Sequence, residues 1–179
     1  MKDKGLRFLI FLALTAAWLF VMRAMTAPLD PGLILDFEFI GTARESINFL
    51  TGLRDSGQLD LLTRAIFLDF IFPLLYGATF FYATAWICGK LPAKHLFNRV
   101  RLVSTFTIIA VFCDFLENLS LFKLIYYPPE DLYAYLAYFF ATMKFTLLGL
   151  VLAHFIISGL IVVMDSKKSS TDPSATPQD

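Results

Sequence analysis

Six polar side chains lie inside long apolar runs of the sequence, where their types could support binding or acid–base chemistry. They are Asp69, Tyr76, Asp114, Glu117, Asn118 and Lys144. A charged side chain at mid-bilayer costs about 2.5 to 3.5 kcal/mol, so such groups normally face the interior of a helix bundle and mark a function. We therefore treat these six residues as a candidate binding site, in which a carboxylate could serve as acid or base.

The spacing of these residues predicts shared helix faces and one ion pair. Asp114, Glu117 and Asn118 follow the i, i+3, i+4 pattern of a single helix face. With a rise of about 1.5 Å per residue, Glu117 and Lys144 lie at similar depths, about 15 and 18 Å from one end of their apolar runs. We therefore expect Lys144 to pair with Asp114 or Glu117, with Asn118 adding hydrogen bonds.

Asp69 and Tyr76 lie two turns apart on one face of another predicted helix, with Pro73 between them. A proline inside a span usually produces a kink or a local gap in backbone hydrogen bonding.

The predicted cluster holds more acids than cations. Because one lysine cannot neutralise several acids, either an acid is protonated or a further cation or water compensates its charge.

A purely structural role for these charges stays open, because an ion pair can fix the order of helices where lipid gives little hydrophobic force. Lys123 lies near a helix end and is expected to extend toward the headgroups. His154 is isolated and is expected to be structural. The cysteines, Cys88 and Cys113, are separated and belong to no His/Cys cluster, so we expect no metal site and no cofactor.

Four apolar runs must position these residues. Of the 179 residues, 58% are hydrophobic, more than in soluble domains, and the runs predict transmembrane helices at about 7–26, 65–88, 102–127 and 132–164. The expected fold is an all-α integral membrane four-helix bundle, with residues 1–164 forming one domain. The first run also has a signal-peptide character, but Met25 and Pro28 fit a cleavage site poorly, so we expect an uncleaved helix.

The distribution of lysine and arginine predicts the topology. These residues gather before the first run, between the second and third, and after the fourth, which indicates that both termini are cytoplasmic (N-in, C-in) in a cell inner membrane. Thr42 and Glu45 form a capping-box pattern that predicts a short amphipathic helix, Ala43–Leu53, on the outer side. Its expected apolar stripe consists of Ala43, Ile47, Leu50 and Leu53, with Phe49 beside them. Residues 165–179 are expected to be a disordered cytoplasmic tail.

The segments Asp36–Thr42, Asp69 with Tyr76-Gly77, Asp114-x-x-Glu117-Asn118 and Lys144-Phe145 form a pattern that resembles an uncharacterised family of small bacterial four-span membrane proteins. The resemblance extends from about Asp36 to about Leu152. It implies four helices and an inner-membrane location, and it implies no activity.

Several functions fit these residues. The first is a non-enzymatic multi-pass protein whose polar pocket binds a lipid or small amphiphile, or supports a partner. The second is a membrane-embedded, isomerase-like enzyme that uses intramembrane carboxylates. The third is a proton or ion pathway, which the acids disfavour because they stop near mid-membrane. The net charge of zero argues against a nucleic-acid partner, and the expected partner is the lipid bilayer; the sequence leaves the oligomeric state open.

Overall fold

The computed structural model describes the backbone of residues 2–171 and the side chains of residues 3–165. Over this part of the chain the regular secondary structure is entirely helical, which confirms the all-α prediction. The helices are α1 (Lys2–Thr26), α2 (Pro31–Glu38), α3 (Ala43–Asp55), α4 (Leu59–Asp69), α5 (Phe72–Cys88), α6 (Val100–Tyr126) and α7 (Asp131–Thr171).

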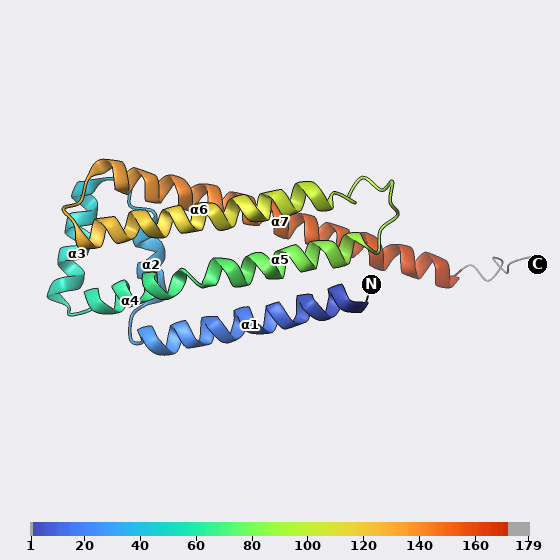
Figure 1. Ribbon diagram of the computed structural model, residues 1–179, viewed down its shortest axis with the longest axis horizontal. Coiled ribbons are helices and arrows are strands. Elements are labelled where there is room, and N and C mark those ends of the chain that lie inside the picture. Colours follow the sequence, from blue (N-terminus) through green and yellow to red (C-terminus); the bar gives the residue numbers. More distant parts are fainter. Residues whose placement is uncertain (1, 172–179) are drawn as a thin grey trace, which may run out of the picture.

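Four long helices run lengthwise beside one another, and three short ones gather at one end (Figure 1). The closest associations are α6 with α7 and α1 with α5, and α5 also packs on α6. The short helices α2, α3 and α4 contact one another and the ends of α6 and α7. This end holds the main hydrophobic core, whose fully buried members include Phe37, Leu62 and Leu121.

Three helices in the described part of the chain are long and apolar enough to cross a membrane: Asp3–Thr26, Leu59–Cys88 and Asp131–Asp165. They contain the predicted runs 7–26, 65–88 and 132–164. The remaining predicted run, 102–127, corresponds to α6, a helix of 27 residues that carries Asp114, Glu117 and Lys123 in its interior and last turns. Many large apolar side chains on the long helices are exposed, as in Phe20, Ile108 and Leu160, which is the surface expected of helices that face lipid.

The predicted helix 65–88 is interrupted and begins earlier than the apolar run. It consists of α4, which ends at Asp69, and α5, which begins at Phe72, with a turn between them. Pro73 has no N–H to donate to the carbonyl of Asp69, so the regular i to i−4 ladder cannot continue through this point. The proline thus places the break next to the acid.

The short helix α3 confirms the predicted start at the capping box and extends two residues past the predicted end. The Thr42 hydroxyl accepts from the Glu45 backbone N–H at 3.3 Å and donates to the Glu45 carboxylate at 2.8 Å. The predicted apolar stripe is confirmed in part, because Leu50 and Leu53 are buried. Ile47 is 47% exposed, and Ser46 is buried in its place. Asp131 at the start of α7 accepts from the Ala43 N–H at 2.7 Å, which ties the two helix starts together.

The helix α2 was not predicted. Asp30 caps it by accepting from the Gly32 N–H at 2.9 Å, and Pro31 occupies its first turn. Both are ordinary start signals, but a helix of 8 residues is too short to show a clear 3.6-residue periodicity.

The last helix, α7, continues to Thr171, so it does not end at Asp165, where the tail was predicted to begin. The rest of the predicted tail, residues 172–179, lies outside the described residues.

Candidate functional site

The side chain of Lys144 lies at the centre of a buried cluster of carboxylates. Its Nζ is 2.8 Å from both carboxylate oxygens of Glu117, 3.4 Å from Glu38 Oε2 and 3.6 Å from Asp114 Oδ1. Among side chains 3–165, these are all the ion pairs that form. The predicted pairing of Lys144 with Asp114 or Glu117 is confirmed, and both acids take part.

Hydrogen bonds join the remaining predicted residues to this cluster. Tyr76 Oη donates to Asp114 Oδ2 at 2.8 Å. Asn118 Nδ2 donates to Asp69 Oδ2 at 2.7 Å and more weakly to Asp114 Oδ1 at 3.3 Å. All six predicted site residues therefore belong to one network built from α4, α5, α6 and α7, and we call it, together with Glu38, the acid–lysine cluster.

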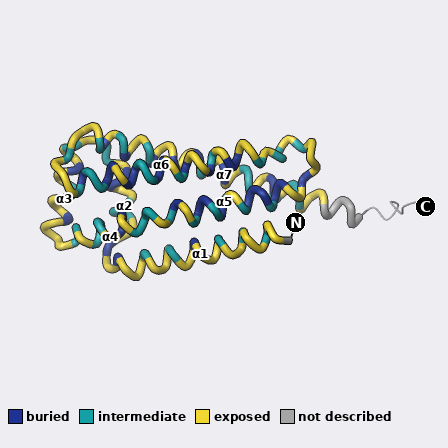
Figure 2. Tube along the Cα trace, in the orientation of Figure 1, coloured by how far each residue is buried: buried dark blue, intermediate teal, exposed yellow. Residues whose placement is uncertain are grey.

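The face of α7 explains why Lys144 points inward. Ala134, Ala137 and Ala141 are completely buried and precede Lys144 at alternating spacings of three and four residues, and Val151 follows on the same face. This spacing is the pattern of a helix that packs along a partner. Small residues on it let α6 approach closely, so Lys144 meets the face of α6 that carries Asp114 and Glu117. Figure 2 shows buried segments, in dark blue, along α5 and α6, whereas α1 is mostly exposed.

Sequence reasoning missed Glu38 as a member of the cluster. It lies at the last position of α2, is only 6% exposed, and contacts Lys144 across 106 positions of the chain. Burial raises the pKa of this carboxyl above its ordinary value, against the opposite influence of Lys144. The signal available in the sequence was the acid pair Asp36 and Glu38 in an otherwise apolar stretch, Leu33 to Ile40.

The burial of the cluster makes its members interdependent. Glu117 is 0% exposed, Asp114 2% and Lys144 5%. An isolated buried charge is strongly unfavourable, whereas paired and hydrogen-bonded charges are tolerated. The cluster nevertheless holds four carboxyl groups and a single ammonium group, so its charges are matched only if acids are protonated or a further cation is present.

A cavity of about 310 Å³ adjoins the acid–lysine cluster. It lies between α2, α4, α5, α6 and α7, and its lining combines four ionisable groups and a tyrosine with apolar side chains. The lining residues are Leu35, Glu38, Asp69, Phe72, Tyr76, Phe80, Asp114, Lys144, Phe145 and Leu148. Leu35 and Phe145 are 47% and 42% exposed, so the cavity reaches the protein surface at an apolar rim formed by these side chains, and its polar lining is buried.

Two other polar residues have structural contacts away from this cavity. Lys123 Nζ lies 3.7 Å from the ring centroid of Tyr127, near the end of α6, as expected for a lysine that extends toward an interface. His154 Nε2 lies 2.8 Å from the carbonyl oxygen of Phe97 and so fixes the α5–α6 connection against α7. Within the described residues, no group of three histidine, cysteine or acidic side chains is arranged to hold a metal ion.

Chemically, the arrangement brings proton-exchanging groups and an ammonium group to the wall of a cavity that also has apolar and aromatic walls. Neither a family model, nor a curated protein, nor a solved structure matches this chain.

Proposed function

We propose that this chain is a multi-pass protein of a bacterial inner membrane, with four spans, whose acid–lysine cluster and adjoining cavity bind a small amphiphile or lipid. The observation that carries the proposal is the cavity itself, because it joins an apolar rim at the protein surface to buried polar groups. Ligand sites typically combine mostly apolar walls with a few oriented polar groups.

The dimensions of α6 support a fourth crossing. Its 27 residues give a length of about 40 Å at about 1.5 Å per residue, which exceeds a hydrocarbon core of about 30 Å. It packs along α7 over much of its length. Its acids face Lys144 and Tyr76, so the charges that disfavour α6 as a span are compensated inside the bundle.

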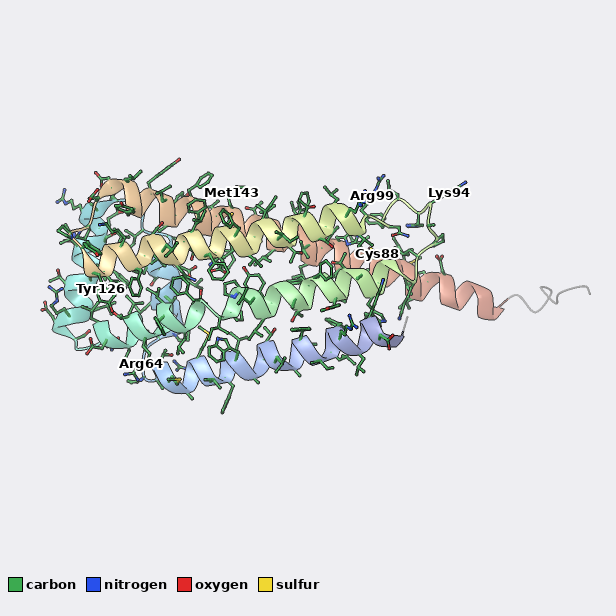
Figure 3. The ribbon with its side chains drawn as sticks, viewed as in Figure 1. Arg64, Cys88, Lys94, Arg99, Tyr126 and Met143 are labelled. Atoms are coloured by element: carbon green, nitrogen blue, oxygen red, sulfur yellow. The ribbon has the colours of Figure 1, made fainter. Side chains whose placement is uncertain are left out.

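The distribution of cations supports the N-in, C-in topology. The N-terminus and the described end of α7 lie at the same end of the bundle (Figure 1). Lys94 and Arg99 lie at that end too, whereas Tyr126 lies at the opposite end (Figure 3). Arg64 lies at the opposite end (Figure 3), in a longer segment that is also rich in acids. Because lysines and arginines near span ends are retained on the cytoplasmic side, the clustered cations support a cytoplasmic location for the first end and an outer location for the short helices α2 and α3.

A cavity-filling variant tests the binding proposal. Leu148 lines the cavity, and Leu148→Trp places an indole in it without changing the charges. Leu150→Trp adds the same group to the same helix at a side chain that is 52% exposed. Mass spectrometry of lipids and metabolites retained by the detergent-purified proteins should find species present with wild type and Leu150→Trp and depleted with Leu148→Trp. Equal sets from all three proteins would overturn the proposal.

A membrane-embedded enzyme of the isomerase type is a second candidate, favoured by the Tyr76–Asp114 hydrogen bond at the cavity wall. A phenol held against a carboxylate can transfer a proton to or from a bound molecule. Incubation of a retained ligand with the protein in deuterium oxide distinguishes this candidate from a binder. Deuterium gained at carbon by the ligand with wild type, and lost with Tyr76→Phe, would support it.

A further inference from the structure

We infer that the cavity takes the ammonium group of a cationic amphiphile, with the attached chain extending past the apolar rim toward the lipid. The inference rests on the proposed function, since it names the class of molecule that the same cavity would bind. Charge, the helix break and the aromatic walls each support it.

The first argument is the charge of the site. Lys144 contacts Glu38, Asp114 and Glu117, and among side chains 3–165 it is the only cation within ion-pair distance of any acid. Asp69 also lines the cavity and has Asn118 as its hydrogen-bond donor, and no cation among side chains 3–165 lies within ion-pair distance of it. An ammonium group placed beside Asp69 and Glu38 would supply that cation.

The helix break beside Asp69 is an independent feature that favours a cation. The last residue of α4 is Asp69, which lines the cavity, so the interruption of the helix lies beside the cavity. The Asp69 carbonyl also lacks the donor that a continuous helix would provide, because position 73 is proline. In membrane proteins, interrupted helices whose C-terminal ends and free carbonyls face a cavity are used to bind cations.

The aromatic walls suit an organic cation. Phe72, Tyr76, Phe80 and Phe145 all line the cavity. The Nζ of Lys144 lies 4.7 Å from the ring centroid of Phe145, so one of these rings already contacts an ammonium group. Faces of aromatic rings attract ammonium groups, and more strongly when water is excluded.

The same features disfavour the other head groups. An anionic head group would approach a lysine that three carboxylates already surround, and it would add a like charge to an acidic site. A small metal ion lacks a suitable set of three ligands within the described residues. The volume of about 310 Å³ lies at the lower end of the range for ligand pockets, which fits a compact head group and the first part of a chain.

Competition between three matched amphiphiles tests the inference. Wild-type protein is released from detergent micelles for native mass spectrometry in the presence of equal concentrations of dodecylamine, dodecanol and dodecanoate. These molecules share one chain and differ in head-group charge. We expect the dodecylamine adduct to exceed each of the others about tenfold or more, because hydrogen bonds to charged groups are stronger than those between neutral groups.

Variants assign the binding to the named acids. Asp69→Asn should lower dodecylamine occupancy about tenfold, whereas Asp60→Asn removes an exposed acid from the same helix and should not. Glu38→Gln, with Asp36→Asn as its exposed control on α2, gives the same comparison if Asp69→Asn fails to fold.

The outcomes separate the inference from the proposed function. Equal or stronger binding of dodecanol or dodecanoate, if it is abolished by Leu148→Trp, would overturn the ammonium inference and leave the amphiphile site standing. Adducts of any kind that Leu148→Trp does not reduce would overturn both. Selective dodecylamine binding that neither Asp69→Asn nor Glu38→Gln weakens would also overturn the assignment of the ammonium group to these acids.

Discussion

The ammonium group of Lys144 lies 2.8 Å from the carboxylate of Glu117, and the two side chains are 6% and 0% exposed. The residues come from α7 and α6, which run side by side and are joined by a short connection between Tyr126 and Asp131. Because this pair is enclosed by the bundle, its contribution to stability depends on both members being present.

Removal of Lys144 alone should strongly destabilise the protein. Lys144→Met leaves buried carboxylates without their cation, at a cost of about 3 to 5 kcal/mol, and adding Glu117→Gln should recover part of the loss. Thermal unfolding in detergent measures both effects, with Lys123→Met as a control because Lys123 contacts aromatic rings near the helix end. An unchanged melting temperature for Lys144→Met would contradict the buried-pair interpretation.

Much of this cluster was predictable because the sequence places charges where lipid or core should be. The helical spacing of Asp114, Glu117 and Asn118 assigned them to one face, and equal depth identified Lys144 as their partner. Glu38 was not predictable in the same way. Its helix is too short for periodicity, and its contact with Lys144 depends on how the connection from α1 to α3 folds back against the bundle.

The predicted continuous helix 65–88 shows a second limit of the sequence. Pro73 indicated a kink, but its position alone does not determine whether a helix bends or stops. The structure has a two-residue interruption at Phe70 and Ile71, where the backbone keeps right-handed helical dihedral angles. The apolar residues of α3 did not determine which face of the helix is buried, since Ser46 is fully buried and Ile47 is exposed. The Ser46 hydroxyl can be buried because it donates a hydrogen bond to the Thr42 carbonyl oxygen at 2.9 Å.

Close packing of α5 on α6 should make Gly77 intolerant of a side chain. A Cβ built at Gly77 would lie 2.6 Å from Val111 Cγ2, and the β-branched valine has little freedom to move. Gly77→Ala should therefore lower the melting temperature, because overpacking costs about 1 to 3 kcal/mol.

Gly149→Ala is the matched control, since a Cβ there meets nothing within 4 Å. It should leave stability unchanged or raise it, because alanine favours helix more than glycine by about 1 kcal/mol. If both glycine variants behave alike, the close approach of α5 to α6 at Gly77 is not present in the protein.

The exposed and buried faces of α3 should label differently from the outside of intact cells. Asn48 is exposed and Ser46 is fully buried, although they are two residues apart. A membrane-impermeant maleimide should label Asn48→Cys rapidly and Ser46→Cys slowly, and wild type is the control because Cys88 and Cys113 are buried. No labelling of Asn48→Cys without prior cell lysis would contradict the outer location of α3, and equal rapid labelling of both would contradict its orientation.

The carboxyl of Glu38 should give the protein a stability that falls as pH rises. Burial raises its pKa in the folded protein above the ordinary value of 4.5, although Lys144 acts in the opposite direction. An acid that holds its proton more tightly when folded stabilises the folded state fully below its ordinary pKa, and this contribution is lost as pH rises through the folded pKa. Glu38→Gln cannot ionise at this position, so the difference in melting temperature, wild type minus Glu38→Gln, should decrease from about pH 4.5 upward. Asp36→Asn, which removes an exposed acid from the same helix, should not reproduce this trend. Melting curves of wild type and Glu38→Gln that stay parallel across the series would show that the Glu38 carboxyl titrates alike in the folded and unfolded chain, and would therefore place it outside the buried cluster.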